Sequence, residues 1–467
     1  MADHEEFEGD KPKRRNRPLI DRGEVAVSAL VLVPILSQHL QGKKIAQGDG
    51  KPIRRSDQAR LEEAKGLAAA INLNVVDVLR VPLTTIRPST LIGKGKLAEI
   101  GDRIHDDKIE LVIMDSPLTP IQQRNLETEW KCKVLDRTGL ILEIFGRRAQ
   151  TREGRLQVEL AHLNYQKGRL VRSWTHLERQ RGGIGFMGGP GETQIEADRR
   201  ALQDKIGRLE RDLEQVRRTR GLHRSNRQKV PHPVVALVGY TNAGKSTLFN
   251  RLTDADIFAK DLLFATLDPT LRTLSLPHGR QIILSDTVGF ISDLPTHLVA
   301  AFRATLEEVL EADVILHVRD ISHEDTAAQA EDVASVLDHL GIKMDEDPRV
   351  IEIWNKIDLL DDEERMSLVD LAGQQQRSLA TEQMQAIALS AITGEGEELL
   401  LEAVEDKLAE KDNLLSVRLD YADGQGLAWL YQHCDVLTRE DEEEGIRLSL
   451  RIQMKYQDEI RNRFRVI

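Results

Sequence analysis

Residues 239–246 have the residue types and the spacing of a phosphate-binding loop. They read Gly-Tyr-Thr-Asn-Ala-Gly-Lys-Ser, which fits the pattern G-x-x-x-x-G-K-[ST]. The apolar run 234–238 before them and the helical pattern 247–252 after them place the loop between a buried strand and a helix N-terminus. Backbone N–H groups and the helix dipole favour a phosphate there. Lys245 is expected to reach the β- and γ-phosphates, and the Ser246 hydroxyl to ligate Mg²⁺.

An Asp-x-x-Gly motif closes the apolar strand pattern at 282–285. Its carboxylate, Asp286, would hold Mg²⁺ through a water, and the N–H of Gly289 would meet the γ-phosphate. The next residue is Phe290, where many GTPases carry the glutamine that orients the attacking water. Because a phenylalanine cannot orient water, we expect slow hydrolysis unaided, or another group that completes the site.

A third motif, Asn-Lys-Ile-Asp at 355–358, ends the strand pattern 350–354 and selects the base. The carboxylate of Asp358 would accept hydrogen bonds from guanine N1–H and N2–H₂. Adenine would leave this carboxylate unpaired, and a buried polar group without a partner rejects the wrong base strongly. We expect Asn355 to support the loop and the stem of Lys356 to pack over the base.

A Ser-Ala pair at 390–391 follows the strand pattern 386–389, and its backbone N–H would meet guanine O6. Motifs in this order, each at the carboxyl end of a predicted strand, predict an α/β fold with a P-loop GTPase domain.

The stretch 263–270 has the character of a switch loop, which must supply a threonine that senses the γ-phosphate and Mg²⁺. Thr266 and Thr270 both qualify by position. The stretch resembles the Phe-x-Thr-x-x-Pro switch of translation GTPases, which favours Thr266. The predicted nucleotide contacts are Gly239, Tyr240, Thr241, Asn242, Ala243, Gly244, Lys245, Ser246, Phe264, Ala265, Thr266, Leu267, Asp268, Asp286, Thr287, Val288, Gly289, Asn355, Lys356, Ile357, Asp358, Leu389, Ser390 and Ala391.

Asn242 occupies a place in the phosphate loop that resembles the potassium-stimulated GTPases. There an asparagine helps to hold a monovalent cation against the β- and γ-phosphates, in the role of an arginine finger. The alternative is that Asn242 only braces the loop, so K⁺ stays open beside Mg²⁺ as a cofactor. The predicted catalytic residues are Lys245, Thr266, Gly289 and Asn242. The predicted Mg²⁺ ligands are Ser246 and Thr266, with Asp286 acting through a water.

The chain has 467 residues and a net charge of −12, and this charge is unevenly spread. Residues 147–229 carry about twenty Lys and Arg against about ten Asp and Glu. A basic segment on an acidic protein is typical of nucleic-acid binding, although a solvated helical hairpin with surplus arginine would also give it.

Cys132 and Cys434 show no disulfide framework or metal spacing and fit a reducing cytosol. The start of the chain lacks the apolar core of a secretory signal, and no apolar stretch approaches the roughly 18 residues of a membrane span.

The chain divides into segments with different patterns. Its length predicts several domains, at roughly 100–200 residues each. The predicted parts are a disordered charged tail (1–20), an α/β domain (21–145), an antiparallel helical hairpin with two heptad stripes (146–230), the GTPase domain (231–411) and a small α/β domain (412–467). In the first α/β domain we expect helices at 57–71, 94–106 and 120–130. In the last we expect strands at 415–419 and 446–452 around a helix at 426–437.

These parts in this order resemble the HflX family of GTPases, which bind the large ribosomal subunit. The resemblance covers nearly the whole chain after the tail and rests on the strings at 91–96, 115–127, 136–138, 179–185, 188–192, 264–270 and 286–290. It implies binding to the 50S subunit and the 70S ribosome, GTP hydrolysis stimulated by the large subunit, and splitting or rescue of stalled ribosomes. Phe290 would then be a family trait. A cytoplasmic monomer without integral membrane association is expected, and peripheral membrane contact stays open.

The glycine-rich loop 181–191, between the two heptad stripes, is the expected RNA-binding tip. It contains a formal G-x-G-x-x-G, but a charged helix precedes it instead of a strand, so we reject a dinucleotide site. Glycines allow close approach, arginines contact phosphates, and apolar side chains stack on unpaired bases. The residues involved would be Arg179, Arg181, Gly183, Gly185, Phe186, Met187 and Gly188. A flexible linker is the alternative for this loop.

Two other functions are compatible with parts of the sequence. A cytosolic regulatory GTPase that acts on a protein partner without RNA would use the same nucleotide motifs. A GTP-dependent RNA-modification enzyme would need a catalytic cysteine or a one-carbon cofactor site, and neither Cys132 nor Cys434 has such surroundings.

Overall fold

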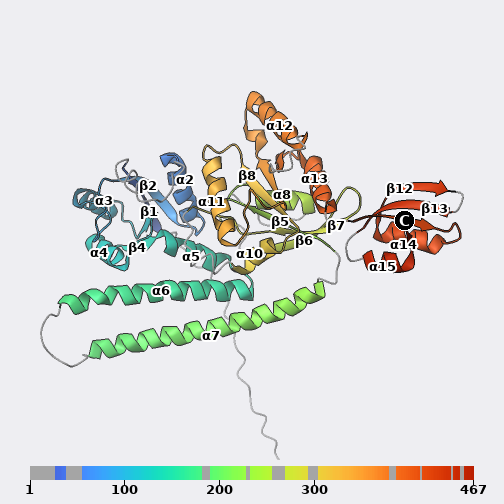
Figure 1. Cartoon of the computed structure of the whole chain (residues 1–467). Helices are drawn as coiled ribbons and strands as arrows, with labels where there is room; N and C mark the ends of the chain where they lie inside the picture. The colour runs from blue at the N-terminus through green and yellow to red at the C-terminus, as the bar shows by residue number, and fades with distance from the viewer. Residues whose placement is uncertain are drawn as a thin grey trace, which may run out of the picture.

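The computed structural model describes residues 27–37, 55–180, 190–227, 232–254, 264, 269–292, 303–377, 385–410, 413–442, 445–452 and 457–467. Within them lie three separate sheets and a pair of long helices (Figure 1).

The N-terminal unit is a parallel four-stranded sheet in the order β2-β1-β3-β4. Local signals set its helix ends: Thr119 and Gln122 form a capping box at the start of α4, and Pro120 is its first helical residue. Helix α5 is an addition to the predicted elements, and the Asp136 side chain caps it by accepting from the Gly139 N–H at 2.8 Å. The elements are β1 (Ser28–Leu36), α2 (Asp57–Ala69), β2 (Asn74–Leu83), α3 (Lys94–Asp106), β3 (Leu111–Met114), α4 (Pro120–Trp130), β4 (Lys133–Asp136) and α5 (Arg137–Arg148).

Two long helices, α6 (Arg152–Gln180) and α7 (Pro190–Arg227), follow the N-terminal unit. They run side by side in opposite directions, below both larger α/β units in Figure 1. Leu163 packs against Ile206 and Leu209 between them, as the heptad spacing predicts.

The central unit is a six-stranded sheet in the order β10-β9-β8-β5-β7-β6, parallel except for β6. Its strands are β5 (Val234–Gly239), β6 (Thr270–Ser275), β7 (Gln281–Asp286), β8 (Val314–Asp320), β9 (Val350–Asn355) and β10 (Gln385–Ala388). Its helices are α8 (Lys245–Thr253), α10 (Arg303–Leu310), α11 (Thr326–His339), η1 (Ile357–Leu359), α12 (Asp362–Arg377) and α13 (Glu397–Ala409). Apolar side chains on one face of this sheet join those of the N-terminal unit in a continuous core, which includes the edge-to-face pair Phe145–Phe264 at 4.7 Å.

The C-terminal unit is an antiparallel sheet in the order β12-β13-β11-β14 with two helices. The predicted helix 426–437 is wrong at its end, because α14 stops at His433 and β12 begins at Asp435. This strand is rich in charged residues and shows no apolar alternation, so its pairing with β13 decides its conformation. The elements are β11 (Asn413–Leu419), α14 (Gly424–His433), β12 (Asp435–Glu442), β13 (Gly445–Ile452), α15 (Gln457–Arg463) and β14 (Arg465–Val466).

Candidate nucleotide site

The phosphate loop turns tightly between β5 and α8, and two of its glycines are required by this geometry. Gly244 is the N-cap of α8 with φ +95°, and a Cβ there would lie 2.1 Å from Nδ2 of Asn355. Gly239 has φ +151°, and a Cβ there would lie 2.2 Å from the Val318 carbonyl oxygen. A side chain at either position would strain the backbone and clash with its neighbours.

Lys245 is buried at the first turn of α8. Its Nζ donates to the carbonyl oxygens of Gly239 at 2.9 Å and Tyr240 at 2.7 Å. Burial lowers the pKa of Lys245 to about 8, against the opposing effect of the Asp286 carboxylate. Lys245 is the first residue of α8. An anion bound at this helix N-terminus would favour the charged form of the lysine.

Ser246 and Asp286 come from different motifs and meet at the carboxyl edge of the sheet. The Ser246 Oγ donates to Oδ2 of Asp286 at 2.8 Å, and Asp286 is fully buried at the end of β7. A hydroxyl and a carboxylate at this distance are oxygen ligands of the kind that Mg²⁺ prefers, so the pair fits the predicted metal. The described residues contain no group of three or more His, Cys, Asp and Glu suited to a metal ion.

The Asp-x-x-Gly segment lies directly on the phosphate loop. Thr241 N–H donates to the Phe290 carbonyl at 2.7 Å, and Phe290 N–H donates to the Gly239 carbonyl at 3.1 Å. A Cβ on Gly289 would lie 3.1 Å from the Lys245 Nζ, so glycine at this position lets the Asp-x-x-Gly segment lie close to the lysine. The Phe290 side chain is 1% exposed and packs in the core.

Asn355 joins the Asn-Lys-Ile-Asp loop to the phosphate loop and the Ser-Ala motif. Its Nδ2 donates to the Ala243 carbonyl at 2.8 Å, and its Oδ1 accepts from the Ala391 N–H at 3.0 Å. One side chain thus connects the phosphate loop, the Asn-Lys-Ile-Asp motif and the Ser-Ala motif. Lys356 has φ +69°, and its Nζ donates to Oδ2 of Asp320 at 2.7 Å.

Asp358 has a buried carboxylate oxygen, Oδ1, with no hydrogen-bond partner among the residues that the structure describes. Leaving such an atom unpaired costs about 1–3 kcal/mol or more, so a ligand with donors would gain from meeting it. Ser390, which is 1% exposed, and Leu389 follow β10 at the same edge of the sheet.

Several predicted site residues are elsewhere or outside the described chain. Phe264 packs on Phe145 in the core, and Thr270 begins β6. Ala265, Thr266, Leu267 and Asp268 lie outside the described residues, and so do Arg181, Gly183, Gly185, Phe186, Met187, Gly188 and the side chain of Arg179. The tail 1–20 also lies outside them.

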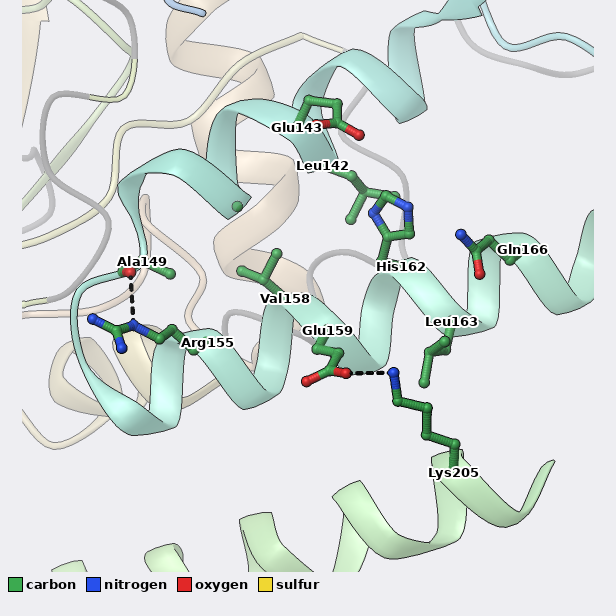
Figure 2. A pocket seen from close by; sticks show the side chains of 11 residues that line it. Leu142, Glu143, Ala149, Arg155, Val158, Glu159, His162, Leu163, Gln166 and Lys205 are labelled. Carbon is green, nitrogen blue, oxygen red and sulfur yellow. Dashed lines mark hydrogen bonds and ion pairs between the residues drawn. The ribbon is translucent and has the colours of Figure 1, made fainter. Parts of the chain in front are cut away.

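One cavity lies beside the phosphate loop, and a larger one lies among the helices α5, α6 and α7. One, of about 220 Å³, opens beside the phosphate loop, where Tyr240, Thr241 and Asn242 face Arg55 of the N-terminal unit and Asp320. The larger, of about 410 Å³, lies between α5, α6 and α7, where Lys205 reaches Glu159 (Figure 2). No predicted site residue lines the larger cavity.

The sequence motifs do not reveal a buried polar cluster beside the phosphate loop. It consists of Glu63, Arg137, Tyr240 and Ser292, from four segments of the chain. Tyr240 belongs to the phosphate-loop motif and Arg137 to the string 136–138, but no spacing rule connects them to Glu63 or Ser292.

No helix among the described residues is long and apolar enough to cross a membrane.

Family models match successive parts of the chain. They are described as GTP-binding GTPase N-terminal (residues 58–146), GTP-binding GTPase Middle Region (148–227), 50S ribosome-binding GTPase (234–356) and HflX C-terminal domain (375–466).

Curated relatives match over most of their length. The GTPase HflX of Magnetococcus marinus is 48% identical over 394 residues, which cover 84% of this chain and 88% of that protein. The GTPase HflX of Escherichia coli is 42% identical over 402 residues, covering 86% and 91%. Among solved structures, a GTP-binding protein from Sulfolobus solfataricus in complex with GDP is 23% identical, with a TM-score of 0.43 over 82% of this chain and 99% of that one.

Proposed function

The chain belongs to the HflX family of GTPases, and from this premise we propose that it binds the 50S subunit and splits or rescues stalled ribosomes. It is a GTP-binding and GTP-hydrolysing protein. The match of residues 234–356 to a model described as a 50S ribosome-binding GTPase carries the ribosomal part of the proposal. The basic segment 147–229 supports it, because surplus arginine favours contact with RNA phosphates.

The roles of the site residues form part of the same proposal. Lys245 would neutralise charge on the β- and γ-phosphates, Ser246 and Thr266 would ligate Mg²⁺, and Asp286 would hold the ion through a water. Mg²⁺ supplies charge neutralisation as phosphate charge develops during hydrolysis. Asp358 receives the guanine donors, which would pair its buried Oδ1.

The missing glutamine leaves the attacking water without an intrinsic orienting side chain. Phe290 is buried in the core, so the Gly289 N–H, Asn242 with a bound K⁺, and the ribosome are the groups proposed to complete the site. Hydrolysis by the isolated protein is accordingly slow and rises on the 50S subunit.

The proposed domains are 21–145, 146–230, 231–411 and 412–467, after the tail 1–20, in a monomer that works in the cytoplasm with ribosomes.

The tip of the helix pair, from Arg179 to Gly188, is the proposed RNA contact. Deleting residues 183–189 should leave GTP affinity intact and impair splitting, because these residues precede the proposed GTPase domain 231–411 in the sequence. If the shortened protein splits ribosomes as well as the intact one, the loop is a linker.

Sedimentation with purified ribosomes tests the proposal. The protein is mixed with 50S subunits or 70S ribosomes together with GDP or a non-hydrolysable GTP analogue, and the pellet and the subunit profile are analysed. We expect the analogue to increase co-sedimentation with 50S and the fraction of free subunits. If the protein stays in the supernatant in every nucleotide state, it is a regulatory GTPase with a protein partner instead.

A further inference from the structure

A buried cluster of polar side chains ties the nucleotide site to the N-terminal unit. The Tyr240 hydroxyl, from the phosphate loop, donates to Oε2 of Glu63 at 2.5 Å and accepts from the Ser292 N–H at 2.8 Å. The Ser292 hydroxyl donates to Oε1 of Glu63 at 2.8 Å. The Arg137 guanidinium donates to Oγ of Ser292 at 2.7 Å and to its carbonyl oxygen at 3.0 Å. Glu63 on α2 and Arg137 on α5 thus hold Ser292 at the end of the segment 289–292, which begins with the glycine of the Asp-x-x-Gly motif.

The charges in this cluster are paired, which gives it a defined geometry. Arg137 forms ion pairs with both Glu63 and Asp115, and all three side chains are largely buried. Burial opposes the charge of Glu63, but Arg137, the Tyr240 hydroxyl and Arg55 outweigh it and lower the pKa of Glu63 to about 2. Removing one partner of such a set leaves an uncompensated buried charge, so the cluster resists partial rearrangement.

Asp136, the residue next to Arg137, contacts helix α6 on the other side, and its Oδ2 also accepts from the Leu118 N–H at 3.1 Å. The Tyr165 hydroxyl donates to Oδ1 of Asp136 at 2.5 Å, and Arg169 donates to Oδ2 at 2.6 Å. The Arg169 guanidinium also lies 4.2 Å from the centre of the Tyr165 ring. Asp136 is the N-cap of α5 as well, so its position sets where that helix begins.

We propose that the adjacent pair Asp136–Arg137 couples helix α6 to the segment 289–292, with Arg137 as the positioning residue for that segment. At the start of α5, Asp136 binds helix α6 on one side and Arg137 binds Ser292 on the other. A displacement of α6 that breaks its bonds to Asp136 shifts the start of α5. The Arg137 guanidinium then loses its alignment with Ser292.

The consequence for hydrolysis follows from how tightly the segment 289–292 is held. Both backbone groups of Phe290 are bonded to the phosphate loop, and Ser292 is bonded through its N–H, carbonyl and hydroxyl. The Gly289 N–H of this segment is proposed to meet the γ-phosphate, so the segment must be able to adjust as the attacking water is positioned. Loosening Ser292 reduces the cost of that rearrangement, so breaking the α6 contacts accelerates hydrolysis in the absence of ribosomes. Since coupling between two sites in binding is reciprocal, nucleotide binding at the γ-phosphate also alters the hold on α6.

Substitutions on α6 test the coupling without touching the nucleotide site. Tyr165→Phe removes one hydroxyl and keeps the ring, and Arg169→Gln removes the charge. In single-turnover GTP hydrolysis by the full-length protein without ribosomes, we expect each to raise the rate about threefold to tenfold, the effect of one such hydrogen bond. GDP affinity should stay within about twofold, because the contacts of the phosphate loop are unchanged. Lys205→Gln is the matched control, since it breaks the 2.7 Å pair with Glu159 between α6 and α7 and leaves Asp136 alone.

A double-mutant cycle separates coupling from general loosening. Ser292→Ala should raise the rate by itself, and adding Tyr165→Phe or Arg169→Gln should then have no further effect, because both act through the same segment. Effects that simply multiply would overturn the proposal. So would an unchanged or lower rate in both α6 variants, or an equal acceleration by Lys205→Gln, and the cluster would then only fasten the two units together.

Discussion

The burial of His317 in the central sheet can be tested by measuring how the stability of the protein depends on pH. It lies in the middle of β8, paired with Val238 just before the phosphate loop, and is 2% exposed. Neither ring nitrogen has a hydrogen-bond partner among the described residues. Burial, with Arg319 and Lys245 nearby, lowers the pKa of His317 from 6.5 to about 3.

The sign of the effect follows from this depressed pKa. Below pH 6.5 the unfolded chain takes up a proton at His317 that the folded protein does not. The contribution of neutral His317 to the free energy of unfolding is therefore full above pH 6.5 and is lost as pH falls toward 3. At 1.36 kcal/mol per unit, the loss is about 1.4 kcal/mol at pH 5.5 and about 2.7 kcal/mol at pH 4.5. Both values hold for any folded pKa well below 4.5.

The perturbation is His317→Leu, which fills a similar volume and cannot be protonated. Urea unfolding followed by tryptophan fluorescence is measured for both proteins from pH 7.5 to 4.5, and the free energies of unfolding are subtracted so that other groups cancel. The variant should gain relative to the wild type by the amounts above as pH falls. His105→Gln, at an exposed position on α3, controls for losing a histidine. A difference that is flat across this range would mean that His317 is not held neutral in the core.

Three further predictions concern the nucleotide site directly. Asp358→Asn presents a donor in place of the buried carboxylate oxygen, so GTP affinity should fall by about 10²-fold or more and XTP should become the preferred nucleotide; competition binding with both nucleotides checks this, and retained GTP preference contradicts the base assignment. Gly244→Ala puts a methyl group 2.1 Å from Nδ2 of Asn355 at φ +95°, so GDP binding should drop at least tenfold, whereas alanine at the open position Gly93 should leave GDP titrations unchanged. Exchanging K⁺ for Na⁺ should slow hydrolysis if Asn242 holds a cation, and equal rates in both salts, with and without ribosomes, would leave it a loop brace.

The sequence by itself determined the features that depend on neighbouring residues. The phosphate loop between β5 and α8, the helix 94–106 and the helix start at Thr119 and Pro120 follow from short patterns whose physics is local. The places of the Asp-x-x-Gly, Asn-Lys-Ile-Asp and Ser-Ala motifs were also predictable, because each follows a strand pattern and parallel strands bring their carboxyl ends to one edge of the sheet.

Only the tertiary structure decided which distant side chains meet. Ser292 and Glu63 are 229 residues apart in the chain, and Arg137 and Ser292 are 155 apart, so no spacing rule indicates their contacts. The same holds for Asn355, which bonds a loop 112 residues away, and for β12, whose charged sequence becomes a strand by pairing with β13. Burial of a paired charge depends on the packing of several elements at once, and a local sequence pattern does not indicate that packing.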